Sequence, residues 1–150
     1  MGGRTGVRRL YIAEPAGAYR VLPPLIVDCS VLVAALFLEP VLGEQARATL
    51  ERCELHAPEL LEYEFASAAL KKIATAGDAI AHAALAAFGG VDVTLHRVNA
   101  KNSFELARGY SLSAYDAAYL WLAAELKAPL ATFDRRLAAA AGQHLGGSRN

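Results

Sequence analysis

Short apolar runs alternate along this chain with longer stretches in which apolar positions recur at helical spacing. The short runs predict strands at residues 25–27, 55–57, 91–98 and 129–133. The longer stretches predict a helix that begins near residue 30, and further helices over about 41–52, 59–76, 78–88, 99–109, 113–127 and 135–141. Because strands alternate with helices, we expect an α/β domain whose parallel sheet is covered by helices on both faces.

The two ends of the chain lack this pattern. Residues 1–24 contain Gly, Arg and Pro without clear periodicity, and we expect them to be an N-terminal extension that is at most partly ordered. The folded domain is expected to span residues 25–145, followed by a short tail at residues 146–150. A chain of 150 residues is long enough for one domain with a substantial core.

Composition and charge narrow the class of protein. With 55% hydrophobic and 20% charged residues, the chain is typical of a globular protein. No run approaches the ~18 apolar residues of a membrane span, and no apolar segment of a secretory signal follows the N-terminal arginines. We therefore expect a cytoplasmic protein without a membrane partner. The 15 Lys and Arg residues balance 15 Asp and Glu residues, which is unlike a strongly basic nucleic-acid binder.

Acidic residues occur where strands end and helices begin. Asp28 interrupts the apolar run LIVDCSVLVAALF, and Asp134 follows the last predicted strand in the same way. Because the carboxyl ends of parallel strands meet at one edge of a sheet, these two carboxylates are expected to converge there. Asp116 lies in the first turn of a predicted helix that starts at Ser113, and Glu64 lies inside a long predicted helix.

Each acid has a structural interpretation and a chemical one. Asp28 and Asp134 could be helix N-caps, Asp116 could form a capping box with Ser113, and Glu64 could be a solvated residue. Several carboxylates at one edge, however, would raise one another's pKa, and a divalent cation removes that conflict. Oxygen ligands favour Mg²⁺ or Mn²⁺, and no cluster of His and Cys suits zinc. Helical periodicity alone does not choose between Glu62 and Glu64.

Three sequence blocks occur in a fixed order along the chain. They are LIVDCSVLVAALF, APELLEYEFASAALKK and ARGYSLSAYDAAYLWLAAELKAPLATFDRRLAAAA. Together they resemble the PIN-domain ribonucleases, and among these the VapC-type toxins of toxin–antitoxin pairs, over roughly residues 25–142. The first block is similar to the family's opening strand and Asp, the second to its Glu-containing helix, and the third to its Ser-x-x-Asp helix and Thr-x-Asp strand end.

The resemblance implies a three-layer α/β/α PIN-like fold with a central parallel sheet, and a metal-dependent endoribonuclease. It selects Glu64 over Glu62. It implies an acidic cluster that binds Mg²⁺ or Mn²⁺ through Asp28, Glu64, Asp116 and Asp134, with contact through water as the alternative for Asp134. Supporting hydroxyl groups would come from Ser30 and Thr132, for which a helix N-cap and an ordinary strand residue are the respective alternatives.

The resemblance also implies partners. These are an RNA substrate, a cognate antitoxin protein and a second copy of the chain in a homodimer. Candidate phosphate contacts are Lys71, Arg135 and Arg136, although a solvated helix face is the more common explanation for any one such residue. Cys29 is expected to be a packed residue, and the aromatic residues Tyr115, Tyr119 and Trp121 of one predicted helix are expected in the core, with a base-stacking platform as the alternative. The alternative function is a non-catalytic PIN-fold module that binds RNA or protein.

Overall fold

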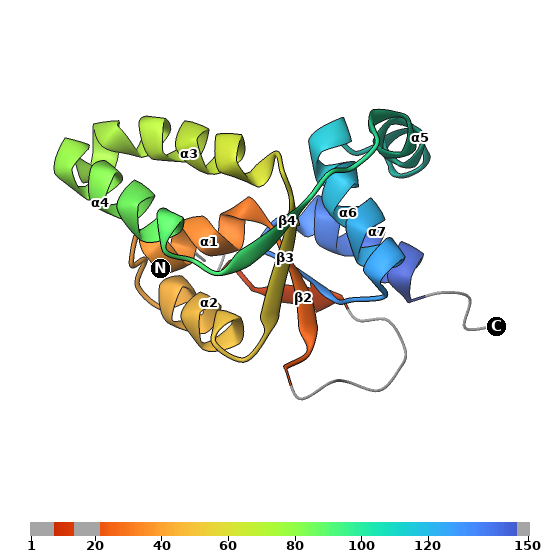
Figure 1. Cartoon of the computed structure of the whole chain (residues 1–150), viewed down its shortest axis with the longest axis horizontal. Helices are drawn as coiled ribbons and strands as arrows, with labels where there is room; N and C mark the ends of the chain where they lie inside the picture. The colour runs from red at the N-terminus through yellow and green to blue at the C-terminus, as the bar shows by residue number, and fades with distance from the viewer. Residues whose placement is uncertain (1–7, 14–21, 147–150) are drawn as a thin grey trace, which may run out of the picture.

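The computed structural model describes residues 8–13 and 22–146. Within them the strands are β1 (Tyr11–Ala13), β2 (Pro24–Val27), β3 (Glu54–Pro58), β4 (Val93–His96) and β5 (Leu130–Thr132). The helices are α1 (Cys29–Leu36), α2 (Leu42–Leu50), α3 (Leu61–Ala76), α4 (Asp78–Gly89), α5 (Ala100–Tyr110), α6 (Ala114–Leu126) and α7 (Arg135–Leu145) (Figure 1). No helix in these ranges is long and apolar enough to cross a bilayer.

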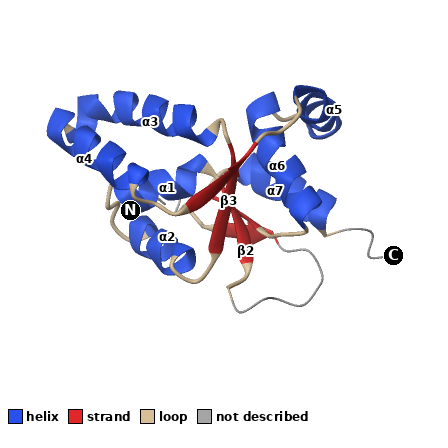
Figure 2. Ribbon diagram, in the orientation of Figure 1, coloured by secondary structure: helices blue, strands red, loops and turns tan. Residues whose placement is uncertain are grey.

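The strands form one mixed sheet in the order β1-β5-β2-β3-β4. The four strands from β5 to β4 are parallel, and β1 pairs antiparallel with β5 at the edge. Helices α1 to α4 lie on one side of the sheet and α5 to α7 on the other (Figure 2). The predicted three-layer α/β/α arrangement is therefore confirmed, with its alternation of strands and helices.

The core is centred on β2, the strand in the middle of the sheet. Leu25, Ile26 and Val27 are buried to 1% exposure or less, because helices cover both faces of this strand. Phe65 of α3 and Tyr119 of α6 are the largest side chains that are fully buried in the described residues, and they enter the core from opposite helical layers. The apolar start of the run LIVDCSVLVAALF is thus explained by double-sided burial.

The predicted ends of the helices and strands differ from the observed ends by only a few residues. The predicted stop between two long helices is confirmed at Gly77, where the backbone has φ +93°, a conformation that favours glycine. Strand β4 is shorter than the predicted 91–98, because only the four central residues, Val93–His96, pair with β3. Helix α7 continues beyond the predicted end at residue 141 to Leu145.

One strand lies in the segment that was expected to be an extension. Tyr11 to Ala13 pair with Thr132 to Leu130, so this part of residues 1–24 belongs to the sheet. The prediction missed it because three residues are too few for alternation to be recognised. By pairing with β5, the strand protects an edge that would otherwise be open. Residues 1–7, 14–21 and 147–150, which include most of the expected tail, lie outside the described residues.

Candidate active site

Asp28 occupies the turn between β2 and α1. Its backbone is the N-cap of α1, but its carboxylate makes no side-chain capping hydrogen bond, so capping does not account for the burial of this residue. Instead, Oδ2 accepts hydrogen bonds from Ser30 Oγ at 2.7 Å and Thr132 Oγ1 at 2.9 Å. Burial, with 6% of the residue exposed, raises the pKa of Asp28, and the two hydroxyl donors oppose that rise.

The same two hydroxyl groups tie the ends of neighbouring strands together. Ser30 Oγ accepts a hydrogen bond from the backbone N–H of Phe133 at 3.1 Å. Thr132 Oγ1 accepts one from the backbone N–H of Asp134 at 2.9 Å. Neither residue therefore has the simple role left open above: Ser30 is not the N-cap, and Thr132 bonds through its side chain. Together they fix the orientation of Asp28.

Glu64 approaches from the first turn of α3. Its Oε1 accepts a hydrogen bond of 2.6 Å from the hydroxyl of Tyr119, a fully buried residue of α6. Burial raises the pKa of Glu64 to about 7, repulsion from Asp28 and Asp116 adds to the rise, and the Tyr119 hydrogen bond opposes it. Glu62 is exposed, so tertiary packing makes the choice between Glu62 and Glu64 that helical periodicity could not.

Asp116 lies in the first turn of α6 and is half-buried. Its backbone N–H donates to Ser113 Oγ at 3.0 Å, which confirms Ser113 as the N-cap. Burial raises the pKa of Asp116, and repulsion from Asp28 and Asp134 raises it further, against the opposing charge of Arg136. Asp116 is therefore electrostatically coupled to both strand-end acids.

Asp134 is exposed and caps α7. Its Oδ1 accepts hydrogen bonds from the backbone N–H groups of Arg136 at 2.8 Å and Leu137 at 3.1 Å. The capping interpretation is thus confirmed for Asp134, in contrast to Asp28. One of its carboxylate oxygens is already engaged by the helix, which is compatible with a contact to the site through water.

The four acids share the edge of the sheet where the parallel strands end. Their side chains do not converge on one point: in residues 8–13 and 22–146, no group of three or more His, Cys, Asp or Glu side chains is arranged to hold a metal ion. Their chemistry nevertheless fits a hard divalent cation. All the donors are carboxylate oxygens, and three of the four carboxyls have raised pKa values that a nearby positive charge would lower.

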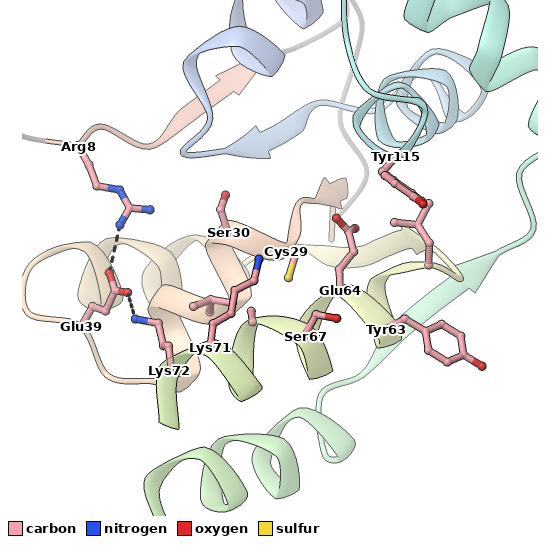
Figure 3. A pocket seen from close by; sticks show the side chains of 13 residues that line it. Arg8, Cys29, Ser30, Glu39, Tyr63, Glu64, Ser67, Lys71, Lys72 and Tyr115 are labelled. Atoms are coloured by element: carbon pink, nitrogen blue, oxygen red, sulfur yellow. Dashed lines mark hydrogen bonds and ion pairs between the residues drawn. The ribbon is translucent and has the colours of Figure 1, made fainter. Parts of the chain in front are cut away.

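A pocket of about 680 Å³ adjoins these acids. One of the acids, Glu64, lines this pocket together with Ser30 and Cys29. Lys71 extends from α3 with its amine toward Cys29 and Ser30 (Figure 3). Three further residues form a charge network along the pocket: Glu39 pairs with Arg8 at 3.8 Å and with Lys72 at 3.1 Å. The acidic edge of the sheet thus opens into a pocket with basic groups on its wall.

Comparison with known proteins places this geometry in a family. A family model described as PIN domain matches residues 25–143. The chain belongs to the PIN-domain family. Ribonuclease VapC3 of Pyrobaculum aerophilum is 34% identical over 122 residues, which is 76% of this chain and 92% of that protein. The predicted resemblance is confirmed, and the match includes all four acids but begins after β1, so the edge strand lies outside it.

The aromatic residues of α6 in this PIN domain were only partly predicted. Tyr119 is in the core as expected, but the sequence did not predict its hydrogen bond to Glu64. The one available signal was that Tyr119 lies three residues after Asp116, about one helical turn, which places it near Asp116. Tyr115 was expected in the core and is 65% exposed, so that prediction is wrong. It lies in the first turn of α6, before the helix enters the core at Ala117.

Cys29 behaves as a packed residue. Burial raises the pKa of its thiol to about 12, and repulsion from Glu64 and Asp28 contributes to the rise. A neutral thiol is a poor nucleophile, so Cys29 is unsuited to covalent catalysis despite its place beside Asp28. Both cysteines, Cys29 and Cys53, are free.

Proposed function

We propose that this PIN domain is a metal-dependent endoribonuclease, the toxin of a toxin–antitoxin pair, and that it hydrolyses RNA phosphodiester bonds. The observation that carries the proposal is electrostatic. Asp28, Glu64 and Asp116 all have raised pKa values: burial alone raises the pKa of Asp28, and partial burial together with repulsion from neighbouring carboxylates raises those of Glu64 and Asp116. A bound divalent cation would relieve that repulsion, and the ribonuclease named among the relatives supports RNA as the substrate.

The proposed roles follow from the contacts of each carboxylate. Asp28, Glu64 and Asp116 would hold Mg²⁺ or Mn²⁺, and Asp134, which already caps α7, would contribute through water. When bound, the cation supplies Lewis-acid activation of the scissile phosphate and of the attacking water. Ser30 and Thr132 hold the Asp28 carboxylate in place by donating to Oδ2. Tyr119 donates to Glu64 Oε1 and so orients the carboxylate that would hold the cation.

Basic residues near the acids would bind the RNA backbone. Lys71 lines the pocket beside Glu64, which supports a phosphate contact there. Arg135 is exposed directly after Asp134. Arg136 donates from Nη2 to the carbonyl of Ser111 at 2.8 Å, so part of its hydrogen-bonding capacity is already used. Lys71 is therefore the strongest candidate of the three.

We also propose two protein partners, a second copy of the chain and an antitoxin. The junction of α1 and α2 exposes Leu38 to 69% and Val41 to 60%, an apolar surface that a second copy of the chain or an antitoxin would cover. We expect the protein to be cytoplasmic and to form a homodimer. Light scattering of the purified protein measures the mass and so tests the dimer. Substitution of both residues by Ser should shift the mass toward the monomer if this surface forms the dimer.

The central experiment is cleavage of total cellular RNA by purified, antitoxin-free protein. Discrete products are expected with Mg²⁺ or Mn²⁺, and none with EDTA or with Asp116→Asn. Glu64→Gln should also abolish cleavage, and its matched control, Glu62→Gln at an exposed acid of the same helix, should cleave as the wild type does. Folded protein that neither cleaves RNA nor binds Mn²⁺ in calorimetry would instead be a non-catalytic binding module.

A further inference from the structure

Two histidine rings that take no part in the acidic site meet on β3 and β4. His56 Nδ1 and His96 Nε2 are 2.9 Å apart, and the ring centroids are separated by 5.2 Å. In the register of these strands His96 pairs with Pro58, two residues beyond His56, so the two histidines are diagonal neighbours on one face of the sheet. They lie 40 positions apart in the sequence, so no local spacing could reveal the pair.

Glu54 determines which nitrogen of His56 carries the proton. Its Oε1 lies 3.3 Å from His56 Nε2, and a carboxylate at that place favours the proton on that nitrogen. The lone pair of His56 Nδ1 is then directed at His96, whose Nε2–H can donate to it. A carboxylate behind an imidazole is also the arrangement that orients histidine ligands at metal centres and raises their basicity.

The separation of the two nitrogens matches one kind of metal coordination. An imidazole nitrogen lies about 2.0–2.1 Å from a bound zinc ion, and similar bond lengths hold for related divalent metals. Two such nitrogens are about 3.3–3.4 Å apart at a tetrahedral angle and about 2.8–3.0 Å apart at a right angle. The observed 2.9 Å is the right-angle value, which is typical of tetragonal Cu²⁺ and Ni²⁺ centres and not of tetrahedral zinc.

A cation can reach the pair because β4 is an edge strand. Burial, and after it the neighbouring His56, lower the pKa of His96, so this ring is neutral at pH 7, which is the form that binds metals. His96 is only half-buried, so it has room on the open edge to turn toward a shared cation. No third His, Cys, Asp or Glu in residues 8–13 and 22–146 completes a three-ligand group, so water would fill the other positions.

We propose that His56 and His96 form a binding site for a divalent transition metal of the Cu²⁺ and Ni²⁺ class, separate from the acidic site. The cation replaces the hydrogen bond between the two rings, and Glu54 orients His56 from behind. Imidazole favours such cations, whereas the carboxylates of the acidic edge favour Mg²⁺ and Mn²⁺. The site holds the end of β4 to β3 beside the turn into α3, where the N–H of Glu59 donates to the carbonyl of His96 at 2.9 Å.

Calorimetric titration of Ni²⁺ into the full-length protein tests the site, with excess Mg²⁺ present to occupy the acidic edge. A single Ni²⁺ should bind. His56→Gln and His96→Gln should each raise its Kd by more than about 10-fold, and Glu54→Gln by about 10-fold, since partners behind a histidine ligand have effects of that size. The matched controls are His82→Gln, an exposed histidine of α4, and Glu51→Gln, an exposed acid just before β3; both should bind as the wild type does.

Two measurements support the titration without depending on the partly buried His56. Pulsed EPR of the Cu²⁺-loaded wild type detects the remote ring nitrogen of each bound imidazole, and two rings are expected. Free Ni²⁺ at 10 times its Kd should raise the folding equilibrium constant of the wild type by about 11-fold, seen as a higher urea midpoint. His96→Gln, a change on the edge strand, should abolish that rise while keeping a cooperative unfolding transition.

The outcomes separate this inference from the proposed nuclease. Ni²⁺ binding that excess Mg²⁺ abolishes, or that His96→Gln leaves unchanged, would overturn the inference, and so would a Cu²⁺ spectrum with one imidazole or none. The two rings would then form only a hydrogen bond between strands. Mn²⁺ binding and RNA cleavage at the acidic edge should be unchanged in His96→Gln. A protein that binds Ni²⁺ at the histidines but neither binds Mn²⁺ nor cleaves RNA would overturn the proposed function alone.

Discussion

Replacing Thr132 by Val tests how the site is held together. The two side chains have nearly the same shape, and valine suits a strand, so the substitution removes a hydroxyl and little else. Thr132 is fully buried, donates to Asp28 Oδ2 at 2.9 Å and accepts from the N–H of Asp134 at 2.9 Å. The variant therefore leaves a buried carboxylate with one donor fewer and a backbone N–H without its acceptor.

The magnitude follows from these two losses. A hydrogen bond to a charged group contributes about 1.5–3 kcal/mol, and a neutral one about 1 kcal/mol. We expect Thr132→Val to lower the free energy of unfolding by about 2–4 kcal/mol, a large part of the ~5–15 kcal/mol typical of a domain. Thr132→Ser keeps both hydrogen bonds and deletes one methyl group, so it should cost only about 1 kcal/mol.

The loss should also depend on pH, with a definite sign. The Thr132 hydroxyl lowers the pKa of Asp28, so its removal raises that pKa further in the folded state and leaves the unfolded state unchanged. A carboxyl whose pKa is higher in the folded state than in the unfolded state lowers the stability of the protein as the pH rises from the unfolded-state pKa to the folded-state pKa. The deficit of Thr132→Val should therefore be smallest in acid, where Asp28 is protonated, and should grow toward neutral pH.

Urea unfolding of the metal-free protein at several pH values measures both effects. The three proteins are wild type, Thr132→Val and Thr132→Ser, compared at equal m-values. A deficit of Thr132→Val that is equal to that of Thr132→Ser, or that is the same at every pH, would refute the reasoning. It would mean that Thr132 acts through packing and that its hydroxyl is not what holds Asp28.

Three further predictions concern other parts of the molecule. Because the pKa of Glu64 rises from 4.5 to about 7 on folding, stability of the metal-free protein should fall between these pH values, and Mn²⁺ should restore it above pH 7; a flat pH profile in urea unfolding would contradict this. Because the thiol of Cys29 has a pKa of about 12, iodoacetamide should modify Cys53 first and Cys29 only on unfolding, as peptide mass spectrometry would show; equal rates would count against it. A chain that begins at Leu22 lacks β1 and exposes the edge of β5, so its urea midpoint should fall; an unchanged midpoint would make β1 dispensable.

Local pattern determined most of the fold. The order of the elements from β2 to α7 could be predicted because helical and strand periodicity are properties of neighbouring residues. The positions of Asp28 and Asp134 at strand ends followed from the same pattern, and a parallel sheet then brings those ends to one edge. The family could be predicted because its motifs lie in three contiguous blocks, which the family match over residues 25–143 confirms.

Other features depended on residues that meet only after folding. Tyr119 lies 55 positions from Glu64, and Thr132 lies 104 positions from Asp28, so no local spacing could reveal either hydrogen bond. Helical periodicity could not choose between Glu64 and Glu62 for the same reason, whereas the family resemblance of the second block did select Glu64.

The sequence by itself therefore determined the order of strands and helices, the family, and the acids at the strand ends, since all of these are written in short contiguous segments. The resemblance named Ser30 and Thr132 as supporting hydroxyl groups, but only the tertiary structure decided that both donate to Asp28 while Asp134 caps a helix, although both acids follow a strand in the same way. The tertiary structure also decided that Tyr115 is exposed and that β1 joins the sheet. The physical reason is that burial and hydrogen-bond partners are set by packing between distant segments, whereas periodicity records only what neighbouring residues do.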